Sequence, residues 1–210
     1  MTTAPGTRAC SLFEDATQPV FGDGQRTARI MMIGEQPGDM EDRAGQAFVG
    51  PAGRLLWQAV DEAGLVRTDL YVTNAVKHFK FRRAERGKRR IHQKPNAAEL
   101  AACRPWLRAE LAAVRPEIVV VLGATAAATT LGSSFRVSRQ RGQVLAWSDL
   151  ADGSPLARDG ELPIDDALVV ATVHPSAVLR SRERAADHAA FVADLDVVAR
   201  IEPGSVTAQG

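Results

Sequence analysis

Two short polar segments, GEQPG at residues 34–38 and HPSAVLR from His174, each follow directly on an apolar run of the sequence. In the first segment Glu35 offers a carboxylate, which can act as a base or stabilise a developing positive charge. In the second segment the His174 imidazole can donate a hydrogen bond to a leaving group that gains negative charge. Taken alone, GEQPG is equally consistent with an ordinary Gly- and Pro-rich turn that has no catalytic role. HPS, taken alone, is equally consistent with an ordinary capped helix start.

Two other segments carry side chains suited to holding a flat, polar ring. Asn74, in TNAVKH, offers an adjacent donor and acceptor, which complement the pairing edge of a pyrimidine. Phe48, in AFVGPAGR, is expected in an exposed Gly-rich loop, where its ring could stack on a base. The glycines of that loop lead toward a helix N-terminus, which can hold a phosphate. The alternatives are an Asn satisfied by local backbone and a Phe buried as a loop anchor.

Basic residues are concentrated at residues 77–94, KHFKFRRAERGKRRIHQK, which hold nine of the 26 Lys and Arg residues and a single acid. This leaves 17 bases against 24 acids elsewhere, so the segment is a localised anion-binding feature on an acidic body. His78, Phe79 and Phe81 interleave with the cations, which favours contact with a nucleic-acid strand over a solvated charge run. His92 ends the KRRIH segment. A neutral imidazole is a competent nucleophile, although a lone histidine at such a place is more often a phosphate contact or a surface residue.

The elements that would position these residues alternate between strand and helix patterns. Apolar runs predict strands at residues 29–33, 70–76, 117–122, 142–147 and 167–173, and helical spacing predicts helices at 52–63, 96–114, 124–131 and 184–200. The alternation, with several strands apolar throughout, predicts an α/β fold whose central, mostly parallel β-sheet is covered on both faces. Because sites in such folds lie beyond the carboxyl ends of strands, we expect GEQPG, the Asn74 region, GATA at 123–126 and HPS to converge.

The bulk properties favour one domain over residues 1–210, with an irregular segment at 1–27 and a surface insertion at 148–166. No apolar run approaches the roughly 20 residues that span a bilayer. The N-terminus lacks the apolar core of a signal peptide, so we expect a cytoplasmic monomer without a membrane partner. The two cysteines, Cys10 and Cys103, are not expected to form a structural disulfide in that compartment. Their spacing alone favours two unrelated buried thiols.

Taken together and in order, these and neighbouring segments resemble the uracil-DNA glycosylase superfamily. The segments that carry the resemblance are GEQPG, FVGPAGR, TNAVKHFKF, KRRIH, ACRPWL, VVLGATAA and HPS. The resemblance covers residues 7–200 apart from 148–166, and it is closest to the family 4-like iron–sulfur branch. Within that branch, Glu35 and KRRIH are similar to the UdgX-type subgroup, whose members crosslink covalently to DNA.

This resemblance implies a three-layer α/β/α fold and an enzyme that excises uracil from DNA, with single-stranded DNA preferred. A flipped uracil would stack on Phe48 and be read by Asn74, and His174 would assist its departure from an oxocarbenium-like sugar. In ordinary relatives a water then attacks C1′, whereas in UdgX-type proteins the KRRIH histidine, here His92, attacks and remains attached. Glu35 would stabilise the cation or help to remove the histidine proton.

Further residues receive roles from the same resemblance. Gln36 would lie at the uracil and hold the loop or a water through its amide. Lys88, Arg89 and Arg90 would hold the KRRIH loop on the DNA backbone. The other DNA contacts that the resemblance implies are Gly34, Gly38, Ser176 and Arg180.

Members of the iron–sulfur branch bind a 4Fe-4S cluster through four residues, two of them from an N-terminal CxxC pair. Cys10, His78 and Cys103 match three of these positions, so the resemblance implies a cluster with these metal ligands. Thr7 stands where the first cysteine of the pair is expected. Because a threonine hydroxyl supplies no thiolate, the alternative is an incomplete or lost cluster.

Two other functions remain open on the sequence. One is an ordinary turnover glycosylase of base excision repair in which His92 is a bystander. The other is a non-catalytic module that binds single-stranded DNA, and the joint presence of Glu35, Asn74 and His174 counts against it.

Overall fold

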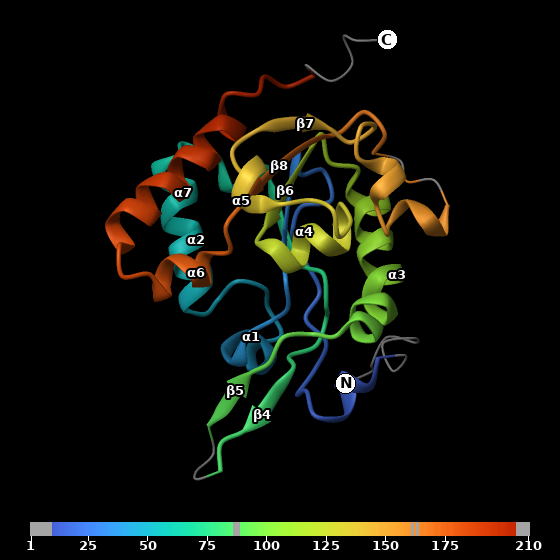
Figure 1. The fold of residues 1–210 in the computed structure, drawn as a ribbon, viewed down its shortest axis with the longest axis vertical. Coiled ribbons are helices and arrows are strands. Elements are labelled where there is room, and N and C mark those ends of the chain that lie inside the picture. The colour runs from blue at the N-terminus through green and yellow to red at the C-terminus, as the bar shows by residue number, and fades with distance from the viewer. Residues whose placement is uncertain (1–9, 86–88, 161, 163, 205–210) are drawn as a thin grey trace.

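The computed structural model describes residues 10–85, 89–160, 162 and 164–204, which fold around a six-stranded sheet (Figure 1). The strand order is β1-β3-β2-β6-β8-β7. The strands span Asp23–Gly24 (β1), Ile30–Gly34 (β2), Leu70–Asn74 (β3), Ile118–Leu122 (β6), Val144–Ala146 (β7) and Leu168–Thr172 (β8). The four central strands run parallel and the two short edge strands pair antiparallel, which confirms the predicted mostly parallel sheet.

Helices cover both faces of this sheet, so the three-layer α/β/α fold is also confirmed. They span Asp39–Ala44 (α1), Pro51–Glu62 (α2), Ala97–Val114 (α3), Ala124–Thr130 (α4), Val137–Gln140 (α5), Pro175–Arg180 (α6) and Arg184–Ala199 (α7). Short 3-10 turns occupy Ser11–Glu14, Arg67–Asp69, Ala151–Gly153 and Ala157–Asp159. In Figure 1, α2, α6 and α7 lie on one side of the sheet and α3 lies on the other. Among the described residues, no helix combines the length and apolar character needed to cross a membrane.

The central strands are buried on both faces because successive side chains point to opposite helical layers. Met32 and Val120 pack in a buried cluster with side chains of α2, α6 and α7. Met31 and Val119 pack in a second cluster with side chains of α3 and α4. Apolar side chains at consecutive positions of a strand therefore serve two cores, which explains the continuous apolar runs of the sequence.

Helix α3 begins with a capping box at the predicted start of the 96–114 helix. Asn96 Oδ1 accepts a hydrogen bond from the Glu99 amide at 2.9 Å, and Glu99 Oε2 accepts one from the Asn96 amide at 2.7 Å. The two bonds satisfy backbone N–H groups that a helix start otherwise leaves without partners. The buried face of the helix that follows carries Cys103 and Glu110.

The basic segment is not an open loop, because two parts of it pair as a hairpin. Strands β4 (Phe81–Arg83) and β5 (Arg90–His92) run antiparallel, with Phe81 opposite His92. They form a two-stranded sheet of their own, which projects from the main body beside α1 (Figure 1). Each strand is only three residues long and carries arginines, so neither produces the apolar run by which β2, β3, β6, β7 and β8 were predicted.

The segment at 148–166, expected as a surface insertion, contributes to the core. Leu156, Leu162 and Ile164 are buried in the same cluster as the α3 side chains. Most of the other described residues of this segment are exposed or half-buried, so three apolar side chains attach a segment that otherwise lies at the surface. That the segment is an insertion stays a prediction.

Candidate active site

Strand β2 pairs in parallel with β3 and β6, and β6 pairs in parallel with β8. The carboxyl ends of β2, β3 and β8 therefore lie at the same edge of the sheet. A cavity of about 400 Å³ opens at this edge, within the range of roughly 300–1,000 Å³ that small-molecule sites occupy. Its lining consists of Glu35, Gln36, Gly38, Ala52, His92, Lys94, His174, Ser176 and Arg180. The structure thus brings residues of GEQPG, KRRIH and HPS to one place.

Glu35 and His92 face each other across the cavity. His92 Nε2 lies 3.5 Å from Glu35 Oε1, and 53% of the His92 side-chain surface is exposed. Burial of the remainder lowers the pKa of His92, and Arg180 lowers it further, while Glu35 acts in the opposite direction. The imidazole is therefore neutral at neutral pH and keeps a lone pair on one ring nitrogen.

His174 is held in one orientation by its own helix start. Its Nδ1 accepts a hydrogen bond from the Ser176 amide at 3.2 Å and lies 2.8 Å from Ser176 Oγ. Burial lowers the pKa of His174 to about 4, with further lowering by Arg180 and His92. A neutral ring that accepts at Nδ1 carries its proton on Nε2, so His174 is a neutral donor in the cavity wall.

Asn74 and Phe48 meet above Gly34. A Cβ added to Gly34 would lie 2.4 Å from Asn74 Oδ1 and 2.8 Å from Phe48 Cζ, so only glycine leaves room for both side chains. Asn74 is buried at the end of β3, and within the described part of the chain its side-chain amide has no hydrogen bond to protein. An amide and an aromatic ring are thereby placed side by side, with the amide still able to bind a ligand.

Phe48 is buried, so the expectation of an exposed ring is wrong. Its backbone is left-handed, with φ at 54°, a conformation that costs a non-Gly residue roughly 1–3 kcal/mol. Trp57 Nε1 donates a hydrogen bond to the Phe48 carbonyl at 3.2 Å. Gly53 leaves room for that carbonyl, because a Cβ at Gly53 would lie only 1.8 Å from its oxygen.

Glu41 connects the two glycine-rich loops, a role that our reading of the sequence missed. This buried carboxylate of α1 accepts from the Gly38 amide at 3.1 Å and from the Gly50 amide at 2.8 Å. Glu41 stands three residues after Gly38, where the glutamate of a capping box binds the N-cap amide, although Gly38 has no side chain to complete the box. That spacing is the signal by which Glu41 could have been found.

Gln36 connects the pocket loop to the base of the hairpin. Its Oε1 accepts from the Lys80 amide at 3.1 Å, and its Nε2 donates to the Gln93 carbonyl at 2.9 Å and to the Lys80 carbonyl at 3.3 Å. The amide is occupied by backbone groups, which fits the loop-holding role inferred from the sequence and leaves little capacity for contact with a base.

Arg90 also connects the hairpin to the body, a role within the protein that its assignment as a DNA contact did not include. Its guanidinium pairs with Asp39 and, at 2.6 Å, with Asp42, and only 9% of its side chain is exposed. It also lies over the rings of Phe79 and Phe81, at 5.3 and 4.8 Å from their centroids. Phe79 is buried, so this ring supports Arg90 rather than offering a surface to nucleic acid.

The other predicted DNA contacts differ in their exposure and in whether they line the cavity. Arg89 and Arg180 are exposed, and Arg180 and Ser176 line the cavity. Gly34 is buried as the last residue of β2, whereas Gly38 lies in the cavity wall. Lys88 lies outside the described residues.

Cys10, His78 and Cys103 are all buried, with Cys103 in α3 and Cys10 packed against it. The Nδ1 of His78 has no hydrogen-bond partner in the described part of the chain. A hydrogen bond between the thiols lowers the pKa of Cys10 to about 7, while the same bond and burial raise that of Cys103. No three His, Cys, Asp or Glu side chains of the described residues come together as a metal-binding group, and Thr7 lies outside them. Among the described residues, Cys10 and Cys103 form a thiol pair.

Known proteins resemble the chain over most of its length. The family model of the uracil DNA glycosylase superfamily matches residues 21–196. A type-4 uracil-DNA glycosylase of Thermotoga maritima is 33% identical over 83% of this chain and 78% of its own length. Similar enzymes of Archaeoglobus fulgidus and Sulfurisphaera tokodaii are 32% and 31% identical, and the matches cover 82% of this chain in both cases and 77% and 70% of those proteins.

The Arg90 contacts predict a loss of stability on its removal. Asp42 is fully buried, so we expect Arg90→Ala to lower the free energy of unfolding by roughly 3 kcal/mol, because the carboxylate would remain buried without its cation. Chemical denaturation measures this loss. The matched control is Arg89→Ala, which removes an exposed arginine one position earlier and is expected to change stability by no more than about 0.5 kcal/mol. Equal effects of the two substitutions would contradict the connecting role of Arg90.

Proposed function

Since the chain belongs to the uracil DNA glycosylase superfamily, on its type-4 branch, we propose that it excises uracil from DNA and retains the sugar on His92. The observation that carries the proposal is the 3.5 Å approach of His92 Nε2 to Glu35 Oε1 in a cavity that His174 also lines. A nucleophile, a carboxylate and a neutral donor are thus available to one reacting centre.

Uracil is held by the pair of side chains above Gly34. The Asn74 amide matches the N3–H and O4 of uracil, since it offers one acceptor and one donor. Cytosine presents the reverse pattern at its corresponding edge and is disfavoured, because a buried amide facing it would be left unpaired. The Phe48 ring, next to the amide, supplies the flat apolar surface on which a flipped base stacks.

His174 promotes the departure of the base. As the C1′–N1 bond breaks, its electron pair leaves with uracil and negative charge spreads to the carbonyl oxygens. The Nε2–H of the neutral His174 donates a hydrogen bond to that charge. The sugar becomes an oxocarbenium-like cation, which the Glu35 carboxylate stabilises across the cavity.

His92 then completes the reaction. The lone pair of its unprotonated ring nitrogen forms the bond to C1′, and the resulting imidazolium loses its remaining N–H proton, for which Glu35 is the nearby base. The uracil anion takes up one proton, so charge is balanced overall. The neutral state of His92 keeps that lone pair free before the attack.

The DNA strand is held by the cations around the cavity. Lys94 and Arg180 lie in its wall. A second recess of about 270 Å³ lies between α2 and the α6–α7 region. Arg54 and Arg184 form part of its lining. Single-stranded DNA is the proposed substrate form, because extruding its base breaks no base pair.

One observation favours a second candidate function, an ordinary turnover glycosylase. Half of the His92 side chain is open to solvent, so a water could reach C1′ in its place. The two functions differ in a single outcome, namely whether the sugar stays on the protein.

We expect the wild-type chain, mixed with a single-stranded oligonucleotide that contains one uracil, to give a band of reduced mobility that resists heat and detergent. His92→Ala removes the only nucleophile proposed for C1′, so the band is lost while free uracil is still released. An oligonucleotide with thymine in place of uracil is the control and gives neither product. Several uracils released per wild-type molecule, with no shifted band, support the turnover enzyme instead.

The acid side of the reaction's pH profile reports on His92. Attack needs the neutral imidazole, and the pKa of His92 lies below its ordinary value of 6.5, so the rate of adduct formation is expected to fall only below pH 6.5. His174, with a pKa of about 4, stays neutral over the same range.

In Glu35→Gln the carboxylate that raises the His92 pKa is absent, so the midpoint moves to still lower pH while the rate itself drops. Single-turnover rates between about pH 4.5 and 8 measure both effects. A wild-type midpoint above pH 6.5, or an upward shift in Glu35→Gln, contradicts the assignment of His92 as the titrating nucleophile.

A further inference from the structure

A fully buried lysine lies directly beneath the base-reading residue and takes no part in the chemistry proposed above. Lys77 Nζ donates to the Asn74 carbonyl at 2.7 Å, to Thr73 Oγ1 at 2.8 Å and to Glu110 Oε2 at 2.5 Å. An ammonium group has three hydrogens, so each one is used. The side chain has no exposed surface.

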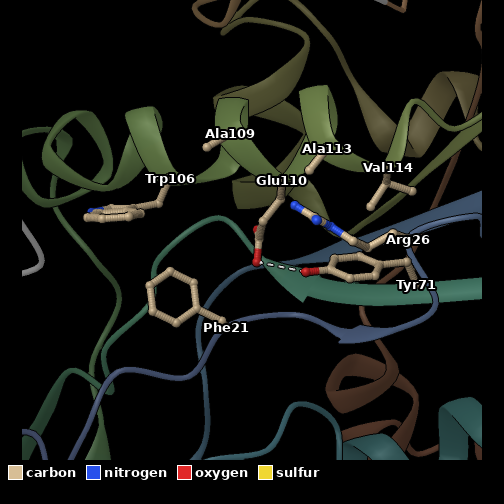
Figure 2. Close-up of a pocket in the computed structure, with 8 residues that line it drawn as sticks. All are labelled: Phe21, Arg26, Tyr71, Trp106, Ala109, Glu110, Ala113 and Val114. Carbon is tan, nitrogen blue, oxygen red and sulfur yellow. Dashed lines mark hydrogen bonds between the residues drawn. The ribbon is translucent and has the colours of Figure 1, made fainter. Parts of the chain in front are cut away.

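Glu110 fixes this ammonium from α3. Its Oε2 also accepts from Thr73 Oγ1 at 2.9 Å, and its Oε1 accepts from the Gly22 amide at 2.8 Å and from Tyr71 at 3.3 Å. Figure 2 shows the carboxylate pointing from α3 toward the Tyr71 hydroxyl, at the wall of a recess of about 210 Å³. The pair therefore joins α3, β3 and the turn that follows β3.

Stability alone does not account for such a pair. Burying two charges is costly, and apolar residues of similar volume often stabilise a protein equally well or better. What this pair adds is a charge-assisted hydrogen bond to one particular carbonyl, that of Asn74.

That carbonyl matters because the Asn74 amide is not held by any hydrogen bond of its own among the described residues. Its direction depends on the backbone that carries it. Two backbone hydrogen bonds hold the turn after β3 to the GEQPG loop, from the Ala75 amide to the Gly34 carbonyl at 2.9 Å and from the Val76 amide to the Glu35 carbonyl at 3.0 Å. The hydrogen bond from Lys77 to the Asn74 carbonyl is a third attachment.

We infer that Lys77 and Glu110 are positioning residues, which keep the Asn74 amide aimed at the base and so determine its preference for uracil. The inference rests on the proposed function of Asn74. The pair makes no contact with DNA and transfers no proton. Loss of the pair weakens recognition of the base and leaves binding of the strand unchanged.

The test uses the double variant Lys77→Met with Glu110→Gln. Met fills the space of the lysine stem, and the Gln amide can still accept from Gly22 and Tyr71 and donate to Thr73. The fold is thereby retained while the bond to the Asn74 carbonyl is lost. Two constants are measured: Ki for free uracil as an inhibitor of the single-turnover reaction, and Kd for single-stranded DNA carrying a tetrahydrofuran abasic analogue.

We expect Ki for uracil to rise about tenfold, the order expected when a misaligned Asn74 amide loses one hydrogen bond to the base, while Kd for the abasic analogue stays within about twofold. The ratio of excision rates for uracil over cytosine falls in parallel. The control is Arg29→Met with Glu117→Gln, which removes the 2.7 Å ion pair at the opposite end of β2 and is expected to leave both constants unchanged.

A double variant with the wild-type Ki for uracil overturns the inference, and so does one in which Ki and Kd weaken equally, since that is the mark of general damage to the fold. If the wild-type chain neither releases uracil nor is inhibited by it, the proposed function itself fails and the inference fails with it.

Discussion

The pairing of Arg90 with two carboxylates of α1 is the interaction on which the geometry of the cavity depends. A two-stranded hairpin is at best marginally stable by itself, and β4–β5 shares no strand with the main sheet. Arg90 and, at the hairpin base, Gln36 attach it to the body. Because His92 is at the end of β5, these attachments also determine its approach to Glu35.

Buried charged side chains also hold other loops around the cavity. Glu41 joins the amides of two glycine-rich loops, and Lys77 joins the Asn74 carbonyl to Glu110 on α3. Glycine-rich loops have few side chains to pack, so buried charged groups that bind backbone amides and carbonyls hold them instead. The sheet is organised by apolar contact, whereas the site at its edge is organised by hydrogen bonds and ion pairs.

The central strands and the edge at which the polar segments meet could be predicted from the sequence, because apolar runs and strand ends are local patterns. The features that could not be predicted depend on distant partners or on backbone conformation. Arg90 reads as one more exposed cation in a basic run, and only the fold brings Asp39 and Asp42 to it. Phe48 is buried and has a left-handed backbone, and its place in a Gly-rich segment suggests neither. Glu41 was within reach, since its capping-box spacing is visible in the sequence.

The separate attachment of the hairpin has an evolutionary consequence. In the proposed function, the base is bound by residues of the main sheet and its loops, whereas the nucleophile belongs to a hairpin that adds no strand to that sheet. Mutations can therefore reshape the appendage, or exchange its histidine, without disturbing how the pyrimidine is seated. Under the proposed mechanism, the difference between a catalyst that releases its product and a protein that is consumed by its substrate is a modular one, and it can be gained or lost in lineages that keep the same scaffold.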